Sequence, residues 1–338
     1  MAGALYGPDG FFVRADDGPA GHFRTSVHAS PLFAGALLRL VQRIDEALGR
    51  PERFDIVDVG AGRGELLETL LALTADDLRS RARLVGVELA PRPEGLSASI
   101  GWATEVPEAV TGLLVATEWL DNVPLDVADL DDSGRLRKVL VDPASGDETL
   151  GGLVDAADRF WLDRWWPEAG RAENERAENE RAENEQPENG RAEIGWPRDA
   201  AWAEAVQRVR RGCALAVDYG HRKEARPVGG TLTGYRGGRQ VRPVPDGRCD
   251  VTAHVAVDAA ALATGTAYEI VTQREALKAL GIDGARPPLD LARTDPAGYL
   301  RALSAAGAAA ELIEPGGLGG HWWLLHTIGI DARGSMLG

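Results

Sequence analysis

Apolar residues along this chain gather in short continuous runs that alternate with longer stretches of helical periodicity. Residues 54–59 form a run rich in β-branched side chains, and residues 65–74 follow it with leucines at helical spacing. Runs that are apolar throughout predict strands covered on both faces. Strands of this kind are predicted at 54–59, 83–88, 113–118, 213–219 and, as a closing strand, 320–328. The alternation predicts an α/β fold on a doubly wound, mostly parallel sheet.

The helical stretches complete this pattern. The clearest runs from Leu32 to Gly49, where Gly49 and Pro51 predict its end. Further helices are predicted at 65–74, 201–211, 255–265, 272–282 and 295–307. Residues 1–35 show no sustained period and are expected to form turns and short pieces.

One stretch shows neither the apolar pattern of a strand nor that of a helix. The sequence RAENE occurs three times in register, beginning at Arg171, Arg176 and Arg181. Because it holds no large apolar residue, it predicts a solvated insertion at about 168–195; an acidic arm that binds a partner is the alternative. The expected organisation is an N-terminal lid and helical segment, an α/β core interrupted by this insertion, and a C-terminal part that completes the sheet and the acceptor site; these are residues 1–50, 51–220 and 221–338.

Charge and cysteine content exclude several classes of protein. The 338 residues carry a formal charge of −15, of which −3 belongs to the RAENE repeats, and this balance disfavours nucleic-acid binding. The two cysteines, Cys213 and Cys249, cannot build a disulfide framework or a CxxC metal clip. With no apolar run of about 18 residues and no signal-peptide pattern, we expect a cytoplasmic protein without a membrane span. Nothing in the sequence predicts an oligomeric state.

A glycine loop between the first predicted strand and its helix carries the strongest chemical signal. It reads DVGAGRG, with Asp58 ahead of Gly60, Gly62 and Gly64. No GKS or GKT follows, which excludes a P-loop, and Glu65 stands where a dinucleotide fingerprint requires glycine. Glu65 would also repel a pyrophosphate. The GxGxG form therefore suits S-adenosylmethionine (SAM), whose amino-acid end can meet backbone amides and Asp58.

A second acidic residue supports this ligand. Glu88 ends the next predicted strand, where a carboxylate can accept hydrogen bonds from both ribose hydroxyls of an adenosine. The alternative is that Glu88 only caps an exposed strand end. Since the carboxyl ends of adjacent parallel strands lie together, the loop and Glu88 jointly predict SAM as the cofactor.

Several motifs in a shared order resemble the MidA-type SAM-dependent methyltransferases. They span nearly the whole chain apart from the RAENE insertion. The matching segments are YGPDGFF at 6–12, HFRTS at 22–26, SPLF at 30–33, the glycine loop, TEWLDNVP at 117–124, DYG at 218–220, DVTAHV at 250–255, TQ at 272–273 and GLG at 317–319.

This resemblance implies a class I (Rossmann-like) methyltransferase fold with additional N-terminal and C-terminal elements. The family includes the mitochondrial complex I assembly factor that methylates an arginine, so a protein arginine, such as one on a respiratory-complex subunit, is the implied acceptor. Departures from the family pattern concern the acceptor more than the cofactor; they are His22, Val27, His28, Thr117, Asn122, Trp322 and Trp323. A small-molecule acceptor is one alternative, and a non-catalytic assembly or scaffold protein that binds SAM is another.

Two carboxylates follow the third predicted strand, on the side of an open α/β sheet where ligands bind. We expect Glu118 to anchor a guanidinium group bidentately and Asp121 to support it. The alternative is that both only cap the loop before Pro124.

Three further residues are candidates for the site. His254 could take a proton or hold the acceptor loop, although a structural histidine at a strand-to-helix junction is the more ordinary interpretation. It has no His or Cys neighbour at ligand spacing, so we expect no metal. Thr25 and Ser26 could close over the cofactor's carboxylate, and the alternative is a helix cap before Pro31.

Overall fold

The computed structural model describes residues 1–13, 25–167, 169, 190–330 and 335–337. The chain divides into two compact units, a first unit of residues 1–23, 120–204 and 220–265 and a second unit of residues 24–119, 205–219 and 266–338. Both units thus interleave along the chain, whereas the three segments predicted from the sequence are consecutive. The functional roles assigned to those segments remain predictions. The RAENE repeats lie outside the described residues.

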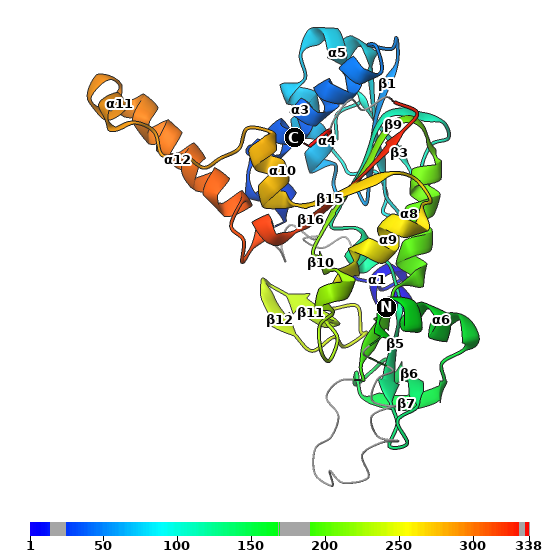
Figure 1. Ribbon diagram of the computed structural model, residues 1–338. Coiled ribbons are helices and arrows are strands. Elements are labelled where there is room, and N and C mark those ends of the chain that lie inside the picture. The colour runs from blue at the N-terminus through cyan, green and yellow to red at the C-terminus, as the bar shows by residue number, and fades with distance from the viewer. Residues whose placement is uncertain (14–24, 168, 170–189, 331–334, 338) are drawn as a thin grey trace. The chain divides into compact units, whose positions relative to one another are not determined.

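A mixed seven-stranded sheet forms the centre of the second unit in the described part of the chain, in the order β15-β16-β9-β4-β1-β2-β3 (Figure 1). Its strands are β1 (Phe54–Val59), β2 (Ala82–Val87), β3 (Ile100–Ala103), β4 (Val110–Thr117), β9 (Val209–Asp218), β15 (Tyr268–Thr272) and β16 (Trp322–Ile328). β1 pairs in parallel with β2 and β4, β2 with β3, and β4 with β9. β16 runs antiparallel to both β9 and β15. The parallel pairing brings the carboxyl ends of β1, β2 and β4 to one edge.

The second unit also contains the following helical elements. They are α2 (Ser26–Ala29), α3 (Pro31–Ala47), α4 (Glu65–Leu73), α5 (Asp76–Arg81), α10 (Gln273–Ala279), α11 (Leu289–Thr294), α12 (Pro296–Leu312) and the 3-10 turn η4 (Leu318–Gly320). α3 begins at Pro31, directly after Ser30, whose hydroxyl accepts a hydrogen bond from the Leu32 amide. α11 and α12 form a helical pair that extends away from the sheet (Figure 1).

Side chains on both faces of the central strands are buried. Ile56, Leu113 and Leu215 join the cluster that includes the apolar faces of α3, α4 and α10. Their neighbours on the opposite face, such as Val57 and Leu114, are also at most 1% exposed. Since full burial of each such side chain contributes about 1.5–3 kcal/mol, this two-sided core explains why the strands are apolar throughout. The predicted strands at 54–59, 83–88, 113–118, 213–219 and 320–328 are confirmed, with ends that differ by at most four residues.

The first unit is built on smaller sheets. Among its described residues the sheet orders are β7-β6-β5-β8, β12-β11-β13 and β10-β14. The strands are β5 (Asp126–Leu130), β6 (Leu136–Val141), β7 (Glu148–Leu153), β8 (Ala192–Ile194), β10 (Gly220–His221), β11 (Thr233–Arg236), β12 (Arg239–Val241), β13 (Asp250–Thr252) and β14 (Val255–Ala256). The helical elements are α1 (Ala2–Tyr6), η2 (Leu120–Asn122), α6 (Ala156–Trp165), η3 (Lys223–Ala225), α9 (Val257–Ala263) and α8 (Trp196–Gln207), which leads into the second unit.

Several predicted boundaries differ from the structure; the helix expected at 295–307, for example, continues to Leu312. The helix expected at 201–211 ends at Gln207, because Val209 and Arg211 already pair with β4. The insertion expected at about 168–195 ends earlier, since Ala192–Ile194 forms the buried strand β8 against β5. Both cysteines are buried free thiols. Within the described ranges, the structure has no helix of the length and apolar character needed to cross a membrane.

Candidate functional site

Three glycines shape the loop between β1 and α4. Gly60, Gly62 and Gly64 have φ values of +72°, +57° and +84°, in the left-handed region where an L side chain is strained. A Cβ atom on Gly60 would lie 2.7 Å from Cδ1 of Trp119, so this tryptophan packs directly on the loop. The GxGxG pattern is therefore required by the backbone conformation and by this close approach.

Carboxylates bind the amides of the loop. The Gly62 amide donates to Oε2 of Glu88 (3.1 Å), and the Arg63 amide donates to Oε2 of Glu65 (3.0 Å). The Gly60 amide donates to the carbonyl of Val87 at the end of β2 (2.9 Å). The structure thus brings together the loop and Glu88, which the sequence paired, and adds Glu65 as a partner that sequence reasoning treated only as a source of repulsion.

Asp58 lies beneath this loop on β1 and is only 2% exposed. Burial raises the pKa of its carboxyl well above the usual range, and the charges of Glu65 and Glu88 raise it further. Its Oδ1 atom has no hydrogen-bond partner among the described residues. A buried carboxylate oxygen of this kind suits a cationic group, such as the ammonium of an amino-acid ligand.

The short helix α2 lies beside the glycine loop. Its N-cap is Thr25, whose hydroxyl accepts from the His28 amide, whereas Ser30 caps the helix that starts at Pro31. Ser26 is fully buried and donates through its hydroxyl to Oε1 of Gln273 (3.2 Å). His28 Nε2 lies 3.4 Å from Oε1 of Glu65. The predicted contact of Thr25 and Ser26 with a cofactor carboxylate stays a prediction.

Glu118 directly follows β4 and adopts an uncommon backbone conformation. Its φ is +51°, which for a non-glycine residue costs on the order of 1–3 kcal/mol. Its amide donates to the carbonyl of Val217 (2.8 Å), and its Oε1 accepts from the amide of Ser26 (3.0 Å). Tertiary contacts thus hold the predicted guanidinium anchor in place at the carboxyl edge of the sheet.

Asp121 belongs to the first unit, where η2 carries it. It is 2% exposed, and its Oδ2 accepts a hydrogen bond from the hydroxyl of Thr252 (2.6 Å). The neighbouring Asn122 donates to Oδ1 of Asp250 (2.8 Å). The structure therefore joins the two motifs at 117–124 and 250–255. The expected support of Glu118 by Asp121 remains a prediction.

His254 stands in the break between β13 and β14. It is exposed, whereas Asp250 and Thr252 are buried. In an unbroken strand all three side chains would face the same side. His254 instead lies in a different environment from Asp250 and Thr252. Burial lowers the pKa of His254, Asp121 opposes that shift, and Arg198 adds to it. Its amide donates to the hydroxyl of Thr231 (2.8 Å).

Sequence reasoning missed two buried charged residues near the segments that carry Asp121 and His254. Arg198 of α8 is 1% exposed and donates to backbone carbonyls on both motif segments. Glu193 of β8 is 2% exposed and accepts from the amides of Thr231 and Leu232. Neither residue lies in a recognisable motif, and a charged residue that will be buried has no distinguishing local pattern.

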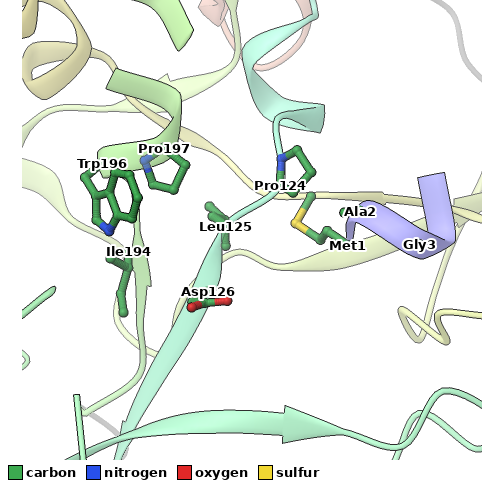
Figure 2. Close-up of a pocket in the computed structure, with 9 residues that line it drawn as sticks. All are labelled: Met1, Ala2, Gly3, Pro124, Leu125, Asp126, Ile194, Trp196 and Pro197. Carbon is green, nitrogen blue, oxygen red and sulfur yellow. The ribbon is translucent and has the colours of Figure 1, made fainter. Parts of the chain in front are cut away.

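A separate cavity of about 420 Å³ opens in the first unit (Figure 2). It is lined by Met1, Ala2, Gly3, Pro124, Leu125, Asp126, Ile194, Trp196 and Pro197. The cavity begins at the end of the TEWLDNVP motif but includes none of the predicted site residues. Among the described residues, no group of three or more His, Cys, Asp or Glu side chains is suited to hold a metal ion.

Comparison with protein families decides the cofactor. A family described as "Putative S-adenosyl-L-methionine-dependent methyltransferase" matches residues 36–275, which are 240 of the 338 residues. The chain belongs to this family. Its cofactor is S-adenosylmethionine, and its activity is that of a SAM-dependent methyltransferase. No curated protein sequence matches the chain.

Solved structures agree with this assignment. A protein from Burkholderia thailandensis that is described as a "superfamily member and likely methyl transferase" was crystallised with S-adenosyl-homocysteine (SAH). It is 25% identical to this chain, with a TM-score of 0.75 over 99% of this chain and 89% of the other. An uncharacterised protein of the same superfamily and organism is 26% identical, with a TM-score of 0.70 and the same coverage of both chains. The chain thus shares the α/β fold, with its mixed sheet, of these proteins.

Proposed function

We propose that the protein transfers the methyl group of SAM to an arginine guanidinium of a protein, such as a respiratory-complex subunit. The observation that carries this proposal is the position of Glu118 at the carboxyl end of β4, held there by Ser26 despite its positive φ. β4 pairs directly with β1, whose end leads into the glycine loop. Ligands of open α/β sheets bind at this edge, and a carboxylate pairs bidentately with guanidinium.

We assign the cofactor contacts to residues at the same carboxyl edge of the sheet. Asp58 would bind the ammonium group of SAM, Glu88 the ribose hydroxyls, and the loop of Gly60, Gly62 and Gly64 the amino-acid end. Thr25 and Ser26 would cover the cofactor's carboxylate. If the seven strands of the sheet are renumbered 1 to 7 in chain order, their order from β3 to β15 is 3-2-1-4-5-7-6. This order supports a class I methyltransferase arrangement and membership of the MidA-type group.

When bound, SAM supplies a methyl group on a sulfonium centre and leaves as a neutral thioether. The residues of this chain align the acceptor nitrogen and dispose of its proton. Glu118 would hold the guanidinium so that one nitrogen faces the methyl carbon, and Asp121 would support that orientation. His254 would take the proton that the methylated nitrogen releases. Burial lowers the pKa of His254 and so favours the neutral imidazole, which is the form that can accept a proton.

A small-molecule acceptor is the second candidate. It is favoured by the cavity at Pro124–Asp126, which begins at the end of the TEWLDNVP motif. Its volume lies within the roughly 300–1,000 Å³ typical of small-ligand sites.

The deciding experiment is labelling with SAM that carries an isotopic methyl group. The purified protein is added to a lysate of a strain from which the gene has been deleted, and protein and low-mass fractions are analysed by mass spectrometry. We expect methylarginine in one or a few proteins. Label confined to the low-mass fraction would support the second candidate, and SAH binding without any transfer would support a non-catalytic scaffold.

Glu118→Gln tests the role of the carboxylate charge. Glutamine retains an oxygen that can accept the Ser26 amide, so we expect SAH affinity within about threefold of wild type and transfer reduced by about 100-fold. Glu46→Gln, an exposed carboxylate of α3, is the matched control and should leave both unchanged. Unchanged transfer by Glu118→Gln would reject Glu118 as the anchor.

A further inference from the structure

Arg198 joins two segments that are far apart in the sequence. Its side chain is buried within the first unit, and its three nitrogens donate to four backbone carbonyls. Nε donates to Val123 (3.1 Å) and Nη2 to Asp121, both at the end of η2. Nη1 donates to Ala253 (2.8 Å) and His254 (3.0 Å), in the break between β13 and β14.

The chemistry of guanidinium explains why arginine occupies this position. Both segments leave regular secondary structure, so their buried carbonyls need donors from elsewhere. Guanidinium presents five N–H donors in one rigid plane, whereas the ammonium group of lysine is a compact point charge with three. One arginine can therefore fix the separation of two backbone segments.

These two segments carry the side chains to which we assign acceptor chemistry. The Asp121 carboxylate is held by Thr252, one residue before the carbonyls that Arg198 binds. The backbone of His254 is fixed on both sides, since its amide donates to Thr231 and its carbonyl accepts from Arg198. Glu193 in turn accepts from the amide of Thr231.

We propose that Arg198 is a positioning residue for methyl transfer, which sets the distance between Asp121 and His254 through their backbones. This inference rests on the proposed function, in which these two residues handle the acceptor. Arg198 itself need not touch substrate. Its loss would displace both side chains while leaving the glycine loop, which belongs to the second unit, intact.

The test combines calorimetry with SAH and the lysate labelling assay for Arg198→Ala, with and without low millimolar guanidinium chloride. We expect transfer to fall about 100-fold and SAH affinity to stay within about threefold. Added guanidinium should restore transfer at least about tenfold for the variant and leave wild type unchanged, a rescue that a general loss of stability would not show. A folded Arg198→Ala protein with wild-type transfer, or a defect that guanidinium does not relieve, would overturn the inference.

Two further variants keep the test decisive. Arg226→Lys changes another buried arginine of the first unit, which binds Asp258 and the carbonyl of Trp165, and should keep transfer within about threefold of wild type. If Arg198→Ala does not fold, Arg198→Lys decides: a loss of about tenfold or more supports the inference, and a change within about twofold overturns it. If wild type labels nothing, the proposed function fails and this inference falls with it.

Discussion

The glycine loop of the second unit and the Asp121–His254 cluster of the first unit are built on opposite principles. The loop and its partner Glu88 lie on neighbouring strands within one continuous stretch, and backbone conformation dictates which residues it can contain. The cluster draws Asp121, Arg198, Thr252 and His254 from separate segments and is held by side-chain hydrogen bonds.

Charge separates the two regions as well. Around the loop, burial and the charges of Glu65 and Glu88 raise the pKa of Asp58, and a cationic ligand would relieve this accumulation of carboxyl groups. In the cluster the buried Arg198 lies beside backbone carbonyls. Burial lowers the pKa of His254 there, Asp121 opposes the shift, and the charge of Arg198 adds to it. We therefore expect changes in the loop to abolish cofactor binding, and changes in the cluster to reduce transfer while binding persists.

The largest effect is expected for Gly60→Val. Its φ of +72° strains any L residue by about 1–2 kcal/mol, and the new Cβ would collide with Trp119. We expect SAH affinity to fall by more than about 100-fold in calorimetry. Gly49→Ala is the matched control, since Gly49 has φ +78° but no atom within 4 Å of an added Cβ. Wild-type SAH affinity in Gly60→Val would contradict the expected difference between the two regions.

Asp58→Asn should separate stability from binding. Because folding raises the pKa of Asp58, its ionisation opposes folding, and its contribution to stability is lost as pH rises from the unfolded value of 3.8 through the folded one. At neutral pH the asparagine variant should therefore melt at a higher temperature than wild type without ligand. Its SAH affinity should fall by about 10- to 100-fold.

The pH dependence of binding gives a second measurement of the same residue. Wild-type SAH affinity should weaken as pH falls through the folded pKa of Asp58, because a proton then competes with the ligand's ammonium group. Asp58→Asn should lack this dependence. Asp55→Asn is the control on the same strand; Asp55 is paired with Arg53 and accepts from the Thr111 amide, so this change should lower stability. An Asp58→Asn protein less stable than wild type would contradict the expectation that ionisation of Asp58 opposes folding.

Thr252→Val probes the cluster with a smaller expected effect. It removes the hydrogen bond to the buried Asp121 carboxylate, which should lower the free energy of unfolding by about 1–3 kcal/mol. We expect transfer in the labelling assay to fall about tenfold with SAH affinity unchanged. A parallel loss of SAH affinity would show that the cluster and the loop do not act separately.

The smallest effect is expected for His28→Ala. The contact of His28 with Glu65 is partly exposed, with side chains 27% and 35% accessible, so its loss should change stability by less than about 1 kcal/mol. SAH affinity should stay within about threefold in calorimetry. A tenfold loss would instead make His28 itself part of the cofactor site.

Sequence reasoning predicted five of the seven strands of the central sheet, missing β3 and β15, and predicted the first unit poorly. Strands such as 54–59 are apolar on both faces because helices and strands bury them from both sides, so their pattern is unambiguous. Strands β5 to β7 escaped prediction, since β6 and β7 expose apolar residues such as Leu140 and Leu150 and carry no clear alternation. The contacts of Glu118 with Ser26 and of Asp121 with Thr252 join residues separated by 92 and 131 positions.

The glycine loop, its acidic partner Glu88 and hence the cofactor could be predicted from the residues alone, because these features depend on backbone conformation within a short stretch. The buried, unsatisfied oxygen of Asp58, the contact of Glu118 with Ser26 and the link that Arg198 makes between the two motif segments became visible in the folded chain. Burial and hydrogen-bond partners depend on which distant segments meet, and no local pattern of residues records that.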